Sequence, residues 1–115
     1  MSDEEPGAPR RRAQVVRLRP EYAAEYVRLH KAVWPEVLAT ITACNIRNYS
    51  IYLHDDLLFS YYEYVGADFD ADMRRMAADP HTRRWWKLTD PCQQPVEQAA
   101  PGERWAVLPE VFHHH

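Results

Sequence analysis

Residues 25–36 read EYVRLHKAVWPE, and this stretch decides how the chain begins to fold. Tyr26 and His30 are four residues apart, so on an α-helix they share one face and can reach the same small molecule. Trp34 then ends the helix, because a residue that precedes proline is pushed out of the helical region. A neutral imidazole can both give and take a proton near neutral pH. His30 is therefore the leading candidate for acid–base chemistry.

A packing role would explain the same helix without any chemistry. Tyr22, Tyr26, Leu29 and Val33 repeat at helical spacing, and such a stripe is more often a core face than a binding site. A single histidine beside an apolar stripe is most often packed or half exposed. The helix by itself leaves both interpretations open.

Size and composition narrow the class of protein. The 115 residues suffice for one domain, and 46% hydrophobic with 27% charged residues is ordinary for a soluble globular chain. A formal charge of −3, with one basic run at residues 10–12, gives a nucleic-acid surface little support. No apolar run reaches the length of a membrane span. Cys44 and Cys92 form no C-x-x-C pair, so we expect reduced thiols, no metal and a cytoplasmic location.

The pattern of residues predicts three regions. We expect residues 1–12, which are acidic and contain prolines, to form a disordered leader. Residues 13–112 would form a single α+β domain. Residues 113–115 are histidines and are interpreted as the remnant of a purification tag.

Hydrophobic periodicity, proline positions and capping residues predict the elements of this domain. The expected strands are 13–18, 45–53, 57–65 and 105–112; the expected helices are 20–33, 36–44, 69–78 and 80–89; and 90–104 is an extended loop. The order is that of a ferredoxin-like fold, an antiparallel sheet with its helices on one face. Pro109 confines the last strand to an edge or a bulge.

Two of these elements place aromatic side chains in defined directions. Strict alternation along 45–53 places Tyr49 on one face with Arg47, Ile51 and Leu53, and places Ile46, Asn48, Ser50 and Tyr52 on the other. Neighbouring helical residues point about 100° apart, so one of Trp85 and Trp86 can pack in the core while the other faces a cavity. Without further information, all three aromatics are more often packing residues than ligands.

Other polar residues are interpreted as ordinary surface groups. His54 lies in the expected hairpin turn and His81 in the first turn of a helix, so we expect both to be solvated. The carboxylate pairs Asp55-Asp56 and Asp70-Asp72 are interpreted as turn charges and helix-surface charges.

Five blocks occur in fixed order over residues 13–112: EYVRLHKAVWPEVL, NYSIYL, LLF, RRWWKLTDP and EVF. Together they resemble the L-rhamnose mutarotase family, which includes members that act on L-fucose. The resemblance implies a dimeric α+β barrel, with a sugar pocket between sheet and helices and a C-terminal strand exchanged between the subunits of a homodimer. Family members interconvert the α and β anomers of a 6-deoxyhexose without a metal or cofactor. Carried onto this chain, the resemblance makes His30 the proton donor and Tyr26, Tyr49, Trp85 and Trp86 the sugar-binding residues.

The implied reaction suits these residue types. Mutarotation opens a cyclic hemiacetal, so the anomeric hydroxyl loses a proton while the ring oxygen gains one, and a general acid with a general base suffices. Histidine fits the acid, tyrosine can orient sugar hydroxyls, and an indole face suits the C–H surface and methyl group of a deoxy sugar. The base remains open between a tyrosine, a carboxylate and water.

Two other functions remain compatible with the sequence. The same barrel architecture hosts cofactor-independent monooxygenases, and an aromatic pocket suits them too. A non-catalytic dimeric module that binds a small ligand is the other alternative. The sequence also leaves open whether L-rhamnose, L-fucose or another deoxy sugar is preferred.

Overall fold

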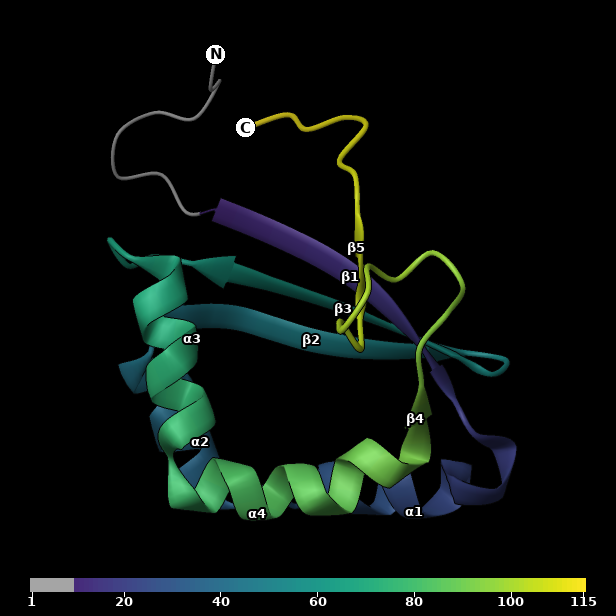
Figure 1. Cartoon of the computed structure of the whole chain (residues 1–115). Coiled ribbons are helices and arrows are strands. Elements are labelled where there is room, and N and C mark those ends of the chain that lie inside the picture. The colour runs from purple at the N-terminus through teal and green to yellow at the C-terminus, as the bar shows by residue number, and fades with distance from the viewer. Residues whose placement is uncertain (1–9) are drawn as a thin grey trace.

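A curved antiparallel sheet with all four α-helices on one side forms the computed structural model, which describes residues 10–115 (Figure 1). The strands follow the order β2-β3-β1-β4, and β5 also pairs with β1. The elements are β1 (Arg10–Leu18), η1 (Pro20–Tyr22), α1 (Ala23–His30), α2 (Pro35–Ala43), β2 (Ile46–His54), β3 (Leu57–Tyr64), α3 (Phe69–Ala78), α4 (Pro80–Thr89), η2 (Asp90–Cys92), β4 (Gln93–Gln94) and β5 (Ala106–Leu108). The predicted ferredoxin-like α+β class is confirmed.

The helices α3 and α4 have the predicted boundaries because each begins at an aspartate cap. The side chain of Asp68 accepts a hydrogen bond from the Ala71 amide at 3.1 Å, and that of Asp79 accepts one from the Thr82 amide at 2.8 Å. Pro80 follows the second cap at the first helical position, where its missing N–H costs nothing. The Asp79 cap fixes the start of α4, which carries both tryptophans of the predicted site.

The first helix is shorter than predicted. Residues 20–22 form a 3₁₀ turn, and α1 ends at His30 instead of near Val33. Trp34 has the extended backbone (φ −60°, ψ 135°) expected before proline, and the chain starts to leave the helix three residues earlier. His30 is therefore the last residue of α1.

A β-bulge in β2 corrects the predicted alternation of its side chains. Asn48 has a φ of +49°, and the pairing of β2 with β3 shifts between Arg47 and Ser50. The extra residue brings Ile46 and Tyr49 to the same face, together with Ile51, while Arg47 moves to the opposite face with Ser50. The prediction was right for Tyr49 and Ile51 and wrong for Ile46 and Arg47.

The two ends of the chain also differ from expectation. Strand β1 begins at Arg10 and pairs with β3 from there, so residues 10–12 are not part of a disordered leader; residues 1–9 lie outside the described part. Strand β5 covers only 106–108, because Pro109 cannot donate to a ladder. It pairs with β1 of the same chain, along the edge that β4 leaves free. Exchange of this strand between subunits, which the resemblance implied, stays a prediction.

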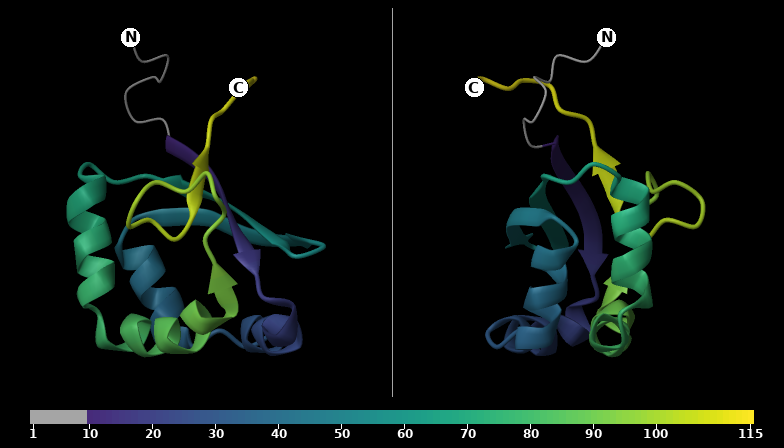
Figure 2. Two further views of the ribbon diagram at one scale, coloured as in Figure 1. Left: turned by 45° about the vertical axis from the view of Figure 1, so that its right-hand side comes forward. Right: turned by 90° about the vertical axis from the view of Figure 1, so that its left-hand side faces the viewer.

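The buried residues form two clusters on the helical side of the sheet. One cluster joins Val16, Leu18 and Leu58 to Tyr26 of α1, and the other joins Ile46, Tyr62 and Tyr64 to α2 and α3. Figure 2 shows the helices from two further directions, arranged around the concave side of the sheet. Within residues 10–115, no helix combines the length and apolar character that crossing a membrane requires.

One predicted surface charge is buried. Asp72 is only 7% exposed and accepts hydrogen bonds from the Tyr64 hydroxyl at 2.5 Å and from Asn45 Nδ2 at 2.9 Å. These hydrogen bonds lower the pKa of the Asp72 carboxyl from its ordinary value. Asp70, two residues earlier, is exposed as predicted. The interpretation of both as helix-surface charges was therefore wrong for Asp72, because α3 turns that position toward β3.

Candidate active site

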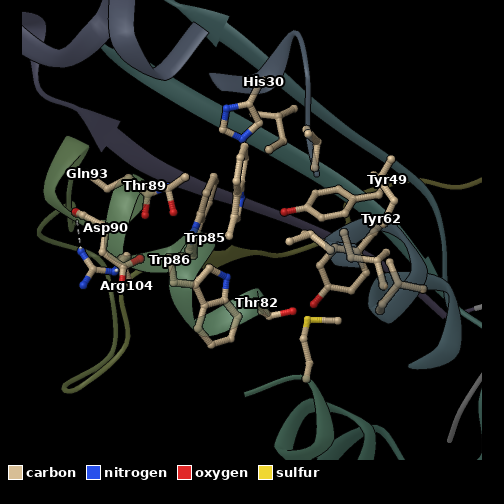
Figure 3. A pocket seen from close by; sticks show the side chains of 18 of the residues that line it. His30, Tyr49, Tyr62, Thr82, Trp85, Trp86, Thr89, Asp90, Gln93 and Arg104 are labelled. Atoms are coloured by element: carbon tan, nitrogen blue, oxygen red, sulfur yellow. Dashed lines mark hydrogen bonds and ion pairs between the residues drawn. The ribbon is translucent and has the colours of Figure 1, made fainter. Parts of the chain in front are cut away.

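A cavity of about 680 Å³ opens between the concave face of the sheet and the helices (Figure 3). Its volume lies in the range of small-molecule sites. Both core clusters contribute to its wall, so the cavity lies between them. Its lining includes all five residues predicted for the site: Tyr26, His30, Tyr49, Trp85 and Trp86.

His30 is held by contacts that fix the direction of its ring. Its Nδ1 lies 2.8 Å from the carbonyl oxygen of Tyr26; since a carbonyl only accepts, Nδ1 carries the proton of this hydrogen bond. The imidazole also stacks on the Tyr26 ring at 4.2 Å and meets the Trp85 ring edge-on at 5.3 Å. Nε2 is therefore the nitrogen left to exchange a proton with a ligand.

Burial desolvates the hydroxyls of the two predicted tyrosines. Burial raises the pKa of Tyr26 to about 12, against a smaller lowering effect of Gln93, whose Nε2 lies 3.5 Å from the Tyr26 hydroxyl. Desolvation likewise raises the pKa of Tyr49. Tyr49 as a whole is 43% exposed, but its hydroxyl points into the cavity. Both phenols therefore hold their protons more strongly than an isolated tyrosine does, which favours their acting as hydrogen-bond donors.

The adjacent tryptophans of α4 differ in burial and in the surfaces that they contact. Trp85 is 6% exposed and packs edge-on against Trp34 at 5.2 Å as well as against His30. Trp86 is half-buried and contributes its indole to the cavity wall. Trp85 thus supports the histidine, while Trp86 offers a free aromatic surface.

A group of polar residues in the cavity wall was not predicted from the sequence. It consists of Gln14, Thr82, Thr89, Asp90, Gln93 and Arg104. Asp90 follows Trp86 by four residues and, as the C-cap of α4, keeps a helical backbone, so helical spacing could have indicated that both lie on one side. Arg104 comes from the long loop after β4, and no local pattern connects it to the site.

Apolar side chains complete the cavity at the end formed by α2 and α3. They are Val33, Val37, Leu38, Ile41, Ile46, Met73 and Met76. His54, His81, Asp55, Asp56 and Asp70 do not line the cavity, in agreement with the prediction that they are surface groups. The wall therefore combines an imidazole, phenols and indoles with one polar and one apolar end.

Fold and cavity together define an α+β protein with a half-barrel sheet and an aromatic small-molecule site. A family model described as L-rhamnose mutarotase matches residues 11–114. The chain therefore belongs to the L-rhamnose mutarotase family, a family of isomerases that act on carbohydrates.

Individual relatives agree with this assignment. An L-rhamnose mutarotase of Opitutus terrae is 32% identical over 103 residues, which is 90% of this chain and 96% of the relative. An L-fucose mutarotase of Xanthomonas campestris pv. campestris is 34% identical over 93 residues, covering 77% of this chain and 74% of the relative.

Solved structures share the fold at lower identity. The crystal structure of an L-rhamnose mutarotase from Formosa agariphila gives a TM-score of 0.71 at 21% identity and covers 92% of this chain and 99% of the other. Tetracenomycin F2 cyclase from Streptomyces glaucescens gives a TM-score of 0.59 at 18% identity. This match covers 92% of the present chain and 96% of the cyclase. The second likeness illustrates that one fold can carry different chemistry.

Proposed function

We propose that this protein is a mutarotase that interconverts the α and β anomers of a 6-deoxyhexose such as L-rhamnose or L-fucose. The observation that carries the proposal is the orientation of His30, whose Nδ1 is engaged with Tyr26 so that Nε2 remains for the ligand. Family membership supports the reaction type. The relatives named for L-rhamnose and for L-fucose support the class of sugar and leave the preference between the two open.

The proposed mechanism moves two protons around a transient open chain. Protonated His30 donates from Nε2 to the ring oxygen while a base takes the proton of the anomeric hydroxyl, and the bond between the anomeric carbon and the ring oxygen breaks. The resulting aldehyde rotates about its bond to the next carbon and recloses by the reverse transfers. Tyr26 and Tyr49 would donate hydrogen bonds to the sugar, and Trp86 would stack on its C–H face.

Anomer exchange measured by saturation-transfer NMR tests this function. The wild-type protein should accelerate exchange of L-rhamnose, L-fucose or both. His30→Ala should lower the rate by about a hundredfold or more, since general acid catalysis typically contributes 10²–10⁴. His54→Ala, which removes an exposed histidine outside the cavity, is the matched control and should leave exchange unchanged.

Two results would contradict the proposal. If the protein accelerated anomer exchange of no 6-deoxyhexose, the mutarotase function would be rejected in favour of the monooxygenase or ligand-binding alternatives. Full exchange in a folded His30→Ala protein would remove the histidine from the mechanism.

We also propose that the protein forms a homodimer through the sheet face turned away from the helices. That face carries Val15, Tyr52, Phe59, Tyr61 and Leu108, with Tyr52 64% exposed. Beyond β5, Val111 and Phe112 are 95% and 80% exposed and lie free to contact a partner in such a dimer.

Light scattering coupled to size exclusion tests the dimer. The wild type should elute with the mass of two chains, and Phe59→Asp should shift it toward one chain while circular dichroism stays unchanged. Val27→Asp, on the exposed side of α1, places the same charge elsewhere and should leave the dimer intact. A monomeric wild type at micromolar concentration would contradict the proposal.

We further propose a cytoplasmic location. The thiols of Cys44 and Cys92 are both free and buried, as is typical of proteins in a reducing compartment. Cell fractionation with an antibody to the protein would test this, and recovery in an extracellular fraction would contradict it.

A further inference from the structure

The polar end of the cavity wall centres on an ion pair between Asp90 and Arg104 (Figure 3). Arg104 Nε lies 3.6 Å from Asp90 Oδ1, and Arg104 Nη1 donates to the Asp90 carbonyl oxygen at 3.3 Å. The two side chains are 39% and 42% exposed. A 3.6 Å contact is longer than a hydrogen bond, so the carboxylate keeps its capacity to accept hydrogen bonds from a ligand.

The chemistry of this pair matches a sugar hydroxyl. Each hydroxyl is at once a donor and an acceptor, a carboxylate accepts through two oxygens, and a guanidinium donates through five N–H groups. An Asp–Arg pair can therefore satisfy both halves of a hydroxyl, and a carboxylate can accept from two neighbouring hydroxyls of one ring. A purely apolar ligand would use neither group.

The position of the pair relative to the tryptophans places these contacts on a single ligand. Trp86 lies in α4, Asp90 is the C-cap four residues later, and both line the cavity, so a ring stacked on the Trp86 indole would present its edge to Asp90. Trp85, the neighbour of Trp86, contacts His30. The two indoles thus connect the proposed acid to the ion pair along one wall.

We propose that Asp90 binds ring hydroxyls of the sugar and so selects the hydroxyl pattern of the substrate, with Arg104 as the residue that positions it. This inference rests on the proposed mutarotase function and identifies which part of the wall distinguishes one 6-deoxyhexose from another. Asp90 is a binding residue in this scheme, and His30 remains the acid.

A structural role for the pair must be distinguished from this one. Arg104 closes the loop after β4 onto the end of α4, so its contact with Asp90 also serves to hold that loop. A loop tether would affect every ligand alike. Hydroxyl recognition would affect only ligands that carry the contacted hydroxyl.

Exchange kinetics with a series of sugars separate the two roles. The series is L-rhamnose, L-fucose and analogues that each lack one ring hydroxyl, measured with wild type, Asp90→Asn, Arg104→Lys and the control Asp70→Asn, whose carboxylate is exposed on α3. Asp90→Asn should raise KM for the preferred sugar about tenfold to a hundredfold, the range of one charge-assisted hydrogen bond, with kcat changed less than about threefold. For the analogue without the contacted hydroxyl, wild type and Asp90→Asn should give the same KM.

Arg104→Lys keeps the charge and loses the fork geometry, so it should raise KM by a smaller factor, and Asp70→Asn should change nothing. An equal rise of KM for all sugars would reduce the pair to a loop tether. A loss of kcat without a change in KM would move Asp90 from binding to chemistry. Either result overturns the inference.

The failure of this inference is distinguishable from failure of the proposed function. A wild-type protein that exchanges no sugar contradicts the mutarotase proposal. In that case, saturation-transfer difference NMR with the same sugars and variants tests Asp90 directly: weaker contact of the hydroxylated sugars with Asp90→Asn supports the binding role, and equal contact rejects it.

Discussion

The two ends of the cavity wall are held in different ways. At one end, His30 is fixed by a residue one helical turn earlier, Tyr26, and by the buried ring of Trp85. At the other end, Asp90 is paired with Arg104, fourteen residues further along the chain, and both side chains remain about 40% exposed. We infer that the two ends have different functions. Proton transfer by His30 requires fixed geometry, whereas recognition of sugar hydroxyls by Asp90 requires access to the ligand.

If this contrast is correct, substitutions at the His30 end should damage both stability and rate, while substitutions at the Asp90 end should affect affinity and leave the fold intact. Loss of the buried Trp85 indole at the His30 end should have the largest effect.

Trp85→Ala should lower the free energy of unfolding by about 3–5 kcal/mol, because it deletes a buried indole that packs on both His30 and Trp34. Trp86→Ala, at the next position, should lower it by less, since this ring is half-buried, and should instead raise KM for the sugar. Urea unfolding with parallel exchange kinetics checks both. Equal destabilisation by the two variants would contradict the proposed division between support and binding.

Asp72 is a buried carboxylate and can be compared with the partly exposed carboxylate of Asp90. The hydrogen bonds of Tyr64 and Asn45 lower the folded-state pKa of Asp72, so this group stabilises the fold above its unfolded pKa of about 4, and the stabilisation is lost as pH falls through the lower folded value. Asp72→Asn should therefore lower stability at neutral pH and flatten the loss of stability in acid.

Thermal unfolding from pH 7 to pH 2 measures the effect of Asp72→Asn, and Asp90→Asn is the natural comparison. If Asp90→Asn reproduced the same loss of acid sensitivity, Asp90 would be a folding residue, and the contrast between the two carboxylates would fail.

The smallest effect on stability should come from Arg104→Gln. Ion pairs between partly exposed side chains contribute less than about 1 kcal/mol, so the free energy of unfolding should fall by no more than this amount. Chemical denaturation provides the measurement. A loss of several kcal/mol would show that the loop is part of the cooperative core, and the Asp90 end would then be as rigid as the His30 end.

Local patterns were sufficient to predict much of the site. Tyr26 and His30 share a helix face because of their i, i+4 spacing, and the caps Asp68 and Asp79 set α3 and α4 where the sequence placed them. The family resemblance named the five residues that line one cavity. Their individual roles remain proposals that the variants above would test.

The sequence by itself therefore determined the order of the four α-helices and of strands β1, β2, β3 and β5, the break before Pro35 and the helix that carries Trp85 and Trp86, because each depends on neighbours within a few residues. It did not predict that α1 ends at His30, or that the expected loop 90–104 begins with η2 and the short strand β4. Only the tertiary structure decided that Ile46 faces the cavity, that Asp72 is buried and that Arg104 reaches Asp90. These features arise from a bulge that shifts strand register, from the packing of α3 against β3 and from the return of a long loop. Each depends on contacts between distant residues, which no local periodicity records.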